Sequence, residues 1–151
     1  MNTFGMKVKA RCFIEYDSVA DLVDIEFEEL ARPVLHIGGG SNLLFTDDFK
    51  GTVLHSKINF IEILDNGLVS VGAGVVFDDF CAWAAKEGLW GVENLSYIPG
   101  EVGASAVQNI GAYGVEVKDV IRTVYCYDTV EEEFVRFSVD ECRYGYRDSI
   151  F

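Results

Sequence analysis

Hydrophobic and polar residues alternate in short blocks along this chain, which is typical of a fold built from many short strands and few helices. The apolar blocks predict strands at residues 8–16, 34–37, 52–55, 60–64, 68–71, 120–127 and 133–137. Between the fourth and the fifth block, Asp65, Asn66 and Gly67 predict a tight hairpin turn. We expect the strands from 52 to 71 to form a meander that contains this hairpin.

Two segments have the apolar spacing of an amphipathic helix. The stronger pattern covers residues 76–87 and predicts a helix that ends at Gly88. Its core-facing stripe comprises Phe77, Phe80, Cys81, Ala84 and Ala85. The weaker pattern predicts a helix that is capped at Ser18 and continues to about Ala31. Its buried side would comprise Leu22, Ile25, Phe27 and Leu30. Together the elements predict an α+β fold.

The 151 residues suffice for one domain with a buried core, and half of them are hydrophobic. Lys and Arg number 12 against 25 Asp and Glu, which gives a net charge of −13. This charge opposes attraction to nucleic acid and to anionic membranes, so we expect neither as a partner. Any bound phosphate must therefore meet a local site, such as the backbone N–H groups of a glycine-rich loop.

The cysteines, at positions 12, 81, 126 and 142, lie far apart and form no Cys-x-x-Cys motif. Neither a metal site nor a disulfide framework is indicated, so we expect reduced thiols. The N-terminus has no apolar signal segment, and no stretch has the length of a membrane span. The expected location is the cytoplasm.

The segment Ile98–Gly114 carries one charge, Glu101, in seventeen positions, and four glycines and three alanines keep its side chains small. Hydrogen-bonding side chains remain at Ser105, Gln108 and Asn109. Because glycine lets a ligand approach the backbone closely, this segment suits a flat, partly apolar ligand. The alternative is a glycine-rich connector between packed elements.

The sequence Gly-Gly-Gly-Ser-Asn at residues 38–42 directly follows a predicted strand. Its consecutive N–H groups, with the side chains of Ser41 and Asn42, could bind a diphosphate. No helix is expected after its last glycine, because Leu43–Phe45 is typical of extended chain, and this disfavours the Gly-x-Gly-x-x-Gly dinucleotide unit. A plain tight turn is the alternative.

Taken together, these motifs resemble those of the UDP-N-acetylenolpyruvoylglucosamine reductase family, flavoenzymes that make UDP-N-acetylmuramate for peptidoglycan. The matching motifs occur in order at residues 2–5, 34–45, 99–100, 103–105, 108–114 and 142–149. The glycine motifs are weak individually, whereas the ordered set that ends in Gly-Tyr-Arg-Asp-Ser at 145–149 is specific.

The resemblance implies an FAD-binding domain of the vanillyl-alcohol oxidase type, with FAD held between two small α+β lobes. Lobe 1 would cover about residues 1–57 and lobe 2 about residues 58–151. The diphosphate would be bound by Gly38, Gly39, Gly40, Ser41 and Asn42. The flavin and its ribityl chain would contact Gly103, Ala104, Ser105, Asn109, Ile110, Gly111, Ala112 and Tyr113.

The resemblance also implies that NADPH passes hydride to the flavin, which then reduces the enolpyruvyl β-carbon of UDP-N-acetylglucosamine enolpyruvate. Arg147 matches the family's active-site arginine, which faces the substrate carboxylate, and Tyr146 matches a neighbouring substrate-binding tyrosine. A guanidinium suits this role because it is always charged and can bind a carboxylate through two hydrogen bonds. Judged from the residues alone, Arg147 could equally pair with Asp148.

The chain departs from the family at two points. Ala106 stands where many members have proline after the serine. The family's proton-donating serine, a glutamate near its C-terminus and the domain that grips the UDP-sugar all lie beyond the position of Phe151. We therefore expect this chain to be part of a longer protein, to bind FAD, and to be inactive on its own.

Two alternatives remain open from the sequence. The first is a stand-alone nucleotide-binding module without catalysis, which a stop codon after Phe151 would favour over a reading frame that continues to a later serine and glutamate. The second is a flavin oxidase with another substrate, which would leave the motif at 145–149 unexplained. His36 and His55 lie in apolar strands without a nucleophile or metal-ligand companion in their motifs, and we expect them to be packing or edge residues.

Overall fold

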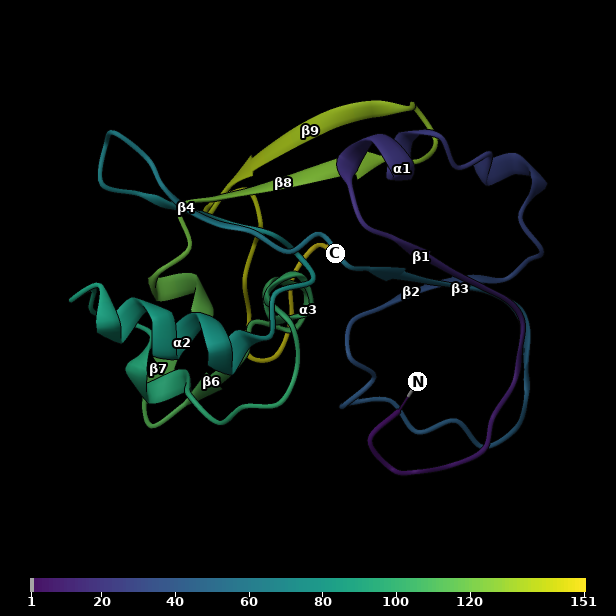
Figure 1. Ribbon diagram of the computed structural model, residues 1–151, viewed down its shortest axis with the longest axis horizontal. Helices are drawn as coiled ribbons and strands as arrows, with labels where there is room; N and C mark the ends of the chain where they lie inside the picture. The colour runs from purple at the N-terminus through teal and green to yellow at the C-terminus, as the bar shows by residue number, and fades with distance from the viewer. Residues whose placement is uncertain (1) are drawn as a thin grey trace.

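The computed structural model describes residues 2–151 and combines short strands with three α-helices, which confirms the predicted α+β class. The first sheet is parallel, with the strand order β1-β3-β2. It consists of β1 (Ala10–Tyr16), β2 (Val34–Ile37) and β3 (Phe49–Ser56), which lie together on the side of the molecule that carries the N-terminus (Figure 1). Because the strands are parallel, their carboxyl ends meet at one edge of the sheet, where open α/β sheets place their ligands.

The predicted meander is wrong, because β3 does not pair with the strands that follow it. β3 is the central strand of the parallel sheet, and β4 (Ile61–Ile63) and β5 (Val69–Val71) form a separate antiparallel pair. A buried central strand has a continuous apolar pattern, which does not reveal the direction of its neighbours. The hairpin turn itself is confirmed: Gly67 has a φ of 79°, and the Leu68 N–H donates to Asn66 Oδ1 at 3.1 Å.

The weaker predicted helix is much shorter than expected. α1 (Val19–Val23) is capped by Ser18, whose Oγ accepts a hydrogen bond from the Asp21 N–H at 3.0 Å. A single 3₁₀ turn, η1 (Phe27–Glu29), follows, and Phe27 is the one buried residue of the predicted apolar side. Helices gain most of their stability by packing an apolar face, and the other apolar residues of this segment stay partly exposed, so the helix does not extend.

The stronger predicted helix is confirmed as α2 (Phe77–Lys86), and Gly88 follows it with a φ of 71°. Its buried stripe packs against η2 (Glu93–Leu95) and η3 (Val117–Asp119). The resulting core cluster comprises Phe77, Cys81, Ala84, Val92, Leu95 and Val117. The short helix α3 (Val102–Gln108) forms within the neutral segment, beside this cluster (Figure 1).

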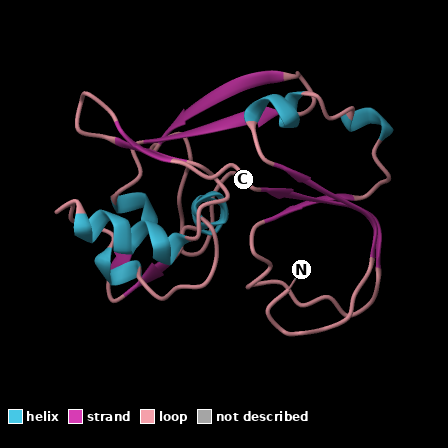
Figure 2. Cartoon of the chain, in the orientation of Figure 1, coloured by secondary structure: helices cyan, strands magenta, loops and turns pink. Residues whose placement is uncertain are grey.

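Two further hairpins complete the fold. β6 (Gly111–Ala112) pairs with β7 (Val115–Glu116), and the predicted strands near the end of the chain are confirmed as β8 (Thr123–Asp128) and β9 (Glu133–Ser138). Figure 2 shows the β8–β9 hairpin extending along one side of the molecule toward α1. There the rings of Tyr127 and Phe27 lie 6.2 Å apart. Among residues 2–151, no helix has the length and apolar character needed to cross a membrane.

Two large aromatic side chains on one face of the β8–β9 hairpin are open to solvent. Tyr125 is 77% exposed and Phe134 is 65% exposed, and the register places both on the same face. Exposed apolar faces and unpaired strand edges promote association. We expect light scattering to show concentration-dependent self-association that Phe134→Glu weakens, because the variant adds charge and removes apolar surface. A monomer at every concentration would contradict this prediction.

Candidate functional site

The predicted site residues converge on an open pocket of about 240 Å³ between the glycine loop after β2 and the segment around α3. Eight of them line it: Gly39, Ser41, Asn42, Ala104, Ser105, Ile110, Gly111 and Arg147. The lining also contains residues that were not predicted as site residues, namely Phe77, Ile98, Pro99, Gly100, Glu101 and Gln108. The remaining predicted residues do not line this pocket: Gly38, Gly40, Gly103, Asn109, Ala112, Tyr113 and Tyr146.

The glycine loop at residues 38–42 begins where β2 ends, at the carboxyl edge of the parallel sheet. The backbone N–H groups of residues 39–42 donate to no protein acceptor among residues 2–151. Gly38 allows close packing, since a Cβ there would lie 2.8 Å from the Ala104 Cβ, and Gly40 has a φ of 67°. Consecutive N–H groups without protein acceptors are donors available to an anion such as the diphosphate of a dinucleotide.

The side chains of the loop connect it to the neutral segment. Ser41 Oγ donates to the Pro99 carbonyl at 3.0 Å, and Asn42 Nδ2 donates to Gln108 Oε1 at 3.0 Å. Both side-chain donors that the sequence suggested for a phosphate are therefore engaged within the protein. The loop retains its backbone N–H groups as its free donors.

Two polar residues of the neutral segment stabilise its own shape. Ser105 is buried, and its hydroxyl donates to the Val102 carbonyl at 2.6 Å. Asn109 is completely buried and ends α3 in the left-handed conformation, with a φ of 46°. Its Nδ2 donates to the Gly145 carbonyl at 2.7 Å, and its Oδ1 accepts from the Lys118 N–H at 3.3 Å. Asn109 thus positions the pocket wall without lining the pocket.

Arg147 reaches the pocket from the C-terminal segment. Its Nη1 donates to the Asn109 carbonyl at 3.1 Å, and its Nη2 donates to the Gly111 carbonyl. In the described part of the chain, no ion pair joins Arg147 to Asp148 or to any other carboxylate. The guanidinium is therefore held in place by backbone carbonyls, and its charge remains available to an anionic ligand. Tyr146 is largely exposed, with its ring centroid 5.4 Å from the Arg147 Cζ.

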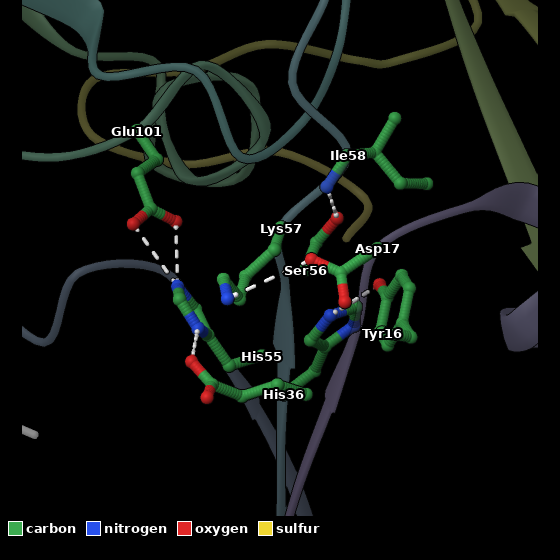
Figure 3. Close-up of polar contacts among 9 residues, drawn as sticks. Tyr16, Asp17, His36, His55, Ser56, Lys57, Ile58 and Glu101 are labelled. Carbon is green, nitrogen blue, oxygen red and sulfur yellow. Dashed lines mark hydrogen bonds and ion pairs between the residues drawn. The ribbon is translucent and has the colours of Figure 1, made fainter.

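A buried histidine lies between two carboxylates close to the carboxyl end of β3 (Figure 3). His55 Nδ1 is 2.9 Å from Glu15 Oε1, and His55 Nε2 is 3.0 Å from Glu101 Oε1. Burial disfavours the charged ring, but the hydrogen bonds and charges of Glu101 and Glu15 outweigh it and raise the pKa of His55. Sequence reasoning missed this cluster because the parallel pairing of β1 with β3 places Glu15 opposite His55, and that pairing has no local signal.

The raised pKa of His55 predicts how stability depends on pH. Folding favours the protonated ring. The stability that this ring contributes is therefore complete below its ordinary pKa of 6.5, and it is lost as the pH rises through the pKa of His55 in the folded protein. We expect the free energy of unfolding to fall between about pH 6 and about pH 8, and to fall more in wild type than in His55→Gln. Urea unfolding at the two pH values measures both changes. Equal changes in both proteins would contradict the prediction.

Within the described residues, no cluster of side chains suggests metal or thiol chemistry. Within residues 2–151, no group of three or more His, Cys, Asp or Glu side chains is arranged to hold a metal ion. All four cysteines, at positions 12, 81, 126 and 142, are free thiols. Burial, with the nearby charges of Asp78 and Glu93, raises the pKa of Cys81 to about 11, so this thiol stays protonated near neutral pH.

Comparison with known proteins agrees with this geometry. A family model described as an FAD binding domain matches residues 10–138. The UDP-N-acetylenolpyruvoylglucosamine reductases of Bacteroides fragilis and Porphyromonas gingivalis are 57% and 48% identical to this chain. Each alignment covers 99% of this chain and 46% of the relative, so the chain spans about half the length of the curated relatives it matches.

A solved structure of a UDP-N-acetylenolpyruvylglucosamine reductase is also similar to this chain. The crystal structure of UDP-N-acetylenolpyruvylglucosamine reductase from Thermus caldophilus matches with a TM-score of 0.78 at 25% identity. The match covers 92% of this chain and 50% of that one. The predicted resemblance and the predicted FAD-binding type of fold are confirmed. The chain belongs to the FAD-binding-domain family, and it aligns with about half the length of UDP-N-acetylenolpyruvoylglucosamine reductases.

Proposed function

We propose that this chain binds FAD, with the diphosphate on the N–H groups of residues 39–42 and the flavin beside residues 104–111. The observation that carries the proposal is the run of backbone N–H groups without protein acceptors in the loop, whose residues Gly39, Ser41 and Asn42 line the pocket together with the neutral segment. Backbone donors let a chain of net charge −13 bind an anion without a basic patch. Because the pocket holds about 240 Å³, it would take part of a dinucleotide, and the rest would extend into solvent or toward other parts of the protein.

We further propose that the complete protein reduces UDP-N-acetylglucosamine enolpyruvate to UDP-N-acetylmuramate, in the cytoplasm and for peptidoglycan synthesis. Bound FAD would supply the hydride chemistry, with NADPH as the donor. Arg147 would bind the enolpyruvyl carboxylate, because its guanidinium lines the pocket and has no carboxylate partner among the described residues. Tyr146 would contact the substrate beside it. That the 151 residues alone do not turn over substrate stays a prediction.

The division into lobes at about residue 57 is also a proposal. It is supported by the topology, since the parallel sheet uses strands from the first 56 residues and every other strand pair forms after them. The ion pair between His55 and Glu101 and the hydrogen bonds of Ser41 and Asn42 would then join the lobes across the FAD site.

The test is a titration of the purified chain with FAD, followed by flavin fluorescence and by the flavin absorption spectrum. We expect saturable binding of one FAD per chain, because the free N–H groups provide a discrete site. Competition by ADP, which carries the same diphosphate, should displace FAD. A chain that is folded by circular dichroism but shows no saturable change with FAD would contradict the proposal.

A further inference from the structure

The cluster of Glu15, His55 and Glu101 stands out because no step of the proposed function uses it. His55 is 5% exposed, and each of its ring nitrogens faces a carboxylate oxygen within 3.0 Å (Figure 3). A neutral imidazole carries one N–H and one acceptor nitrogen, so it can donate to one carboxylate only. Hydrogen bonds to both ionised carboxylates require the doubly protonated ring. The geometry therefore fits an imidazolium between two carboxylates.

Glu101 extends this cluster to the pocket wall. It precedes α3, lines the pocket, and both of its oxygens lie within 3.2 Å of His55 Nε2. The same oxygens approach the glycine loop: Oε2 would lie 3.4 Å from a Cβ at Gly38, and Oε1 would lie 3.6 Å from a Cβ at Gly39. A carboxylate thus stands directly behind the loop whose N–H groups are free. Its negative charge opposes any anion at those N–H groups unless a cation offsets it.

We infer that His55 is a positioning residue for the diphosphate site: as an imidazolium it holds Glu101 behind the glycine loop and offsets its charge, so that a dinucleotide diphosphate binds most tightly when His55 is protonated. This inference rests on the proposed binding of FAD at the loop. It concerns His55 and Glu101 alone and assigns neither a part in hydride transfer.

The other charged and titratable groups around His55 do not replace it in this role. From β1 comes Glu15, and from β2 comes the exposed His36, whose Nε2 lies 2.8 Å from the Tyr16 hydroxyl. Lys57 pairs with Asp17 at 3.6 Å, and both side chains are exposed. Arg147, which also lines the pocket, is charged at every accessible pH and adds no pH dependence. Desolvation of its ring, with the charge of His55, lowers the pKa of His36 below its ordinary value of 6.5, so His55 is the histidine at the loop whose charge changes above that pH.

Thermodynamic linkage between protonation of His55 and binding of FAD makes the inference measurable. If the protonated ring favours the diphosphate, bound FAD favours the protonated ring by the same factor. The affinity for FAD should then fall as pH rises through the folded pKa of His55, and FAD should raise that pKa further. The diphosphate of FAD stays fully ionised over this range, so its own charge does not create the dependence.

The experiment is the FAD titration repeated between about pH 5.5 and about pH 8.5. We expect the Kd of wild type to rise on the order of fivefold over this range. Glu101→Gln, which removes the carboxylate charge, should bind FAD more tightly at high pH and give a flat profile. His36→Gln, the matched control at the chain's other histidine, should keep the wild-type profile.

A second measurement does not depend on changing the cluster. In His36→Gln, His55 is the one remaining histidine, so its ring proton signals in NMR report its pKa directly. We expect that pKa to exceed 6.5 in the free chain and to rise when FAD is added. Saturable FAD binding with no pH dependence, or with an unchanged His55 pKa, would overturn the inference and leave the proposed function intact. Absence of FAD binding at every pH would overturn the proposed function and, with it, this inference.

Discussion

Gly39→Asp is expected to weaken FAD binding by about 100-fold while the chain stays folded. A Cβ at Gly39 would meet its nearest atom, Glu101 Oε1, at 3.6 Å, which is ordinary van der Waals contact, and this glycine does not require a positive φ. The fold can therefore accept a side chain. The added carboxylate, however, would lie beside Glu101 at the loop that we assign to the diphosphate, and its charge would repel a bound anion. Titration with FAD at fixed pH and salt measures the change.

Two controls separate charge from shape. Gly39→Asn has the same size without the charge, so we expect it to lose clearly less affinity than Gly39→Asp. Asn66→Asp adds the same charge in the β4–β5 turn, where the aspartate oxygen can still accept the Leu68 N–H, and it should bind FAD as wild type does. Gly40 is a poorer choice, since its φ of 67° would strain any side chain. Wild-type affinity in both Gly39 variants would place the diphosphate elsewhere.

The candidate site could be predicted in part because its signals are local. Glycines after a strand and a nearly uncharged segment are visible in the order of residues, and the structure brings eight of the predicted residues to one pocket. Glu101 is different. It is a single charge in a neutral segment, and its role depends on His55, which is 46 residues away in the chain. Nothing near either residue in the sequence indicates the other.

In the fold, too, local features could be predicted from the sequence and long-range pairing could not. The α2 helix and the β4–β5 turn follow from spacing and turn residues within a few positions, and both are confirmed. The pairing of β3 with β1 and β2 depends on long connections that bring parallel strands together. Strand β3 also begins three residues before the predicted start, at Phe49 rather than Thr52, because Gly51 interrupts the apolar pattern. Glycine weakens a strand prediction, yet in a strand it often marks close backbone approach.

Gly51→Ala tests that close approach and should destabilise the protein by about 3–5 kcal/mol. Gly51 is buried in the central strand, and a Cβ there would lie 1.8 Å from the Pro33 carbonyl oxygen and 2.8 Å from two further backbone atoms of Pro33. That oxygen accepts the Thr52 N–H at 3.0 Å, next to the start of β2. The backbone would have to move, which would break this bond and separate β2 from β3. Urea unfolding measures the loss.

Gly145→Ala is the matched control, because it makes the same substitution where a Cβ would meet its nearest atom, the Asp148 Cβ, at an ordinary 3.5 Å. We expect its free energy of unfolding to stay within about 1 kcal/mol of wild type. Since the glycine loop follows β2 directly, loss of the β2–β3 contact should also remove FAD binding from Gly51→Ala. If Gly51→Ala unfolds at the same urea concentration as the control, β3 does not pass as close to Pro33 in solution, and the sheet edge that presents the loop must be arranged differently.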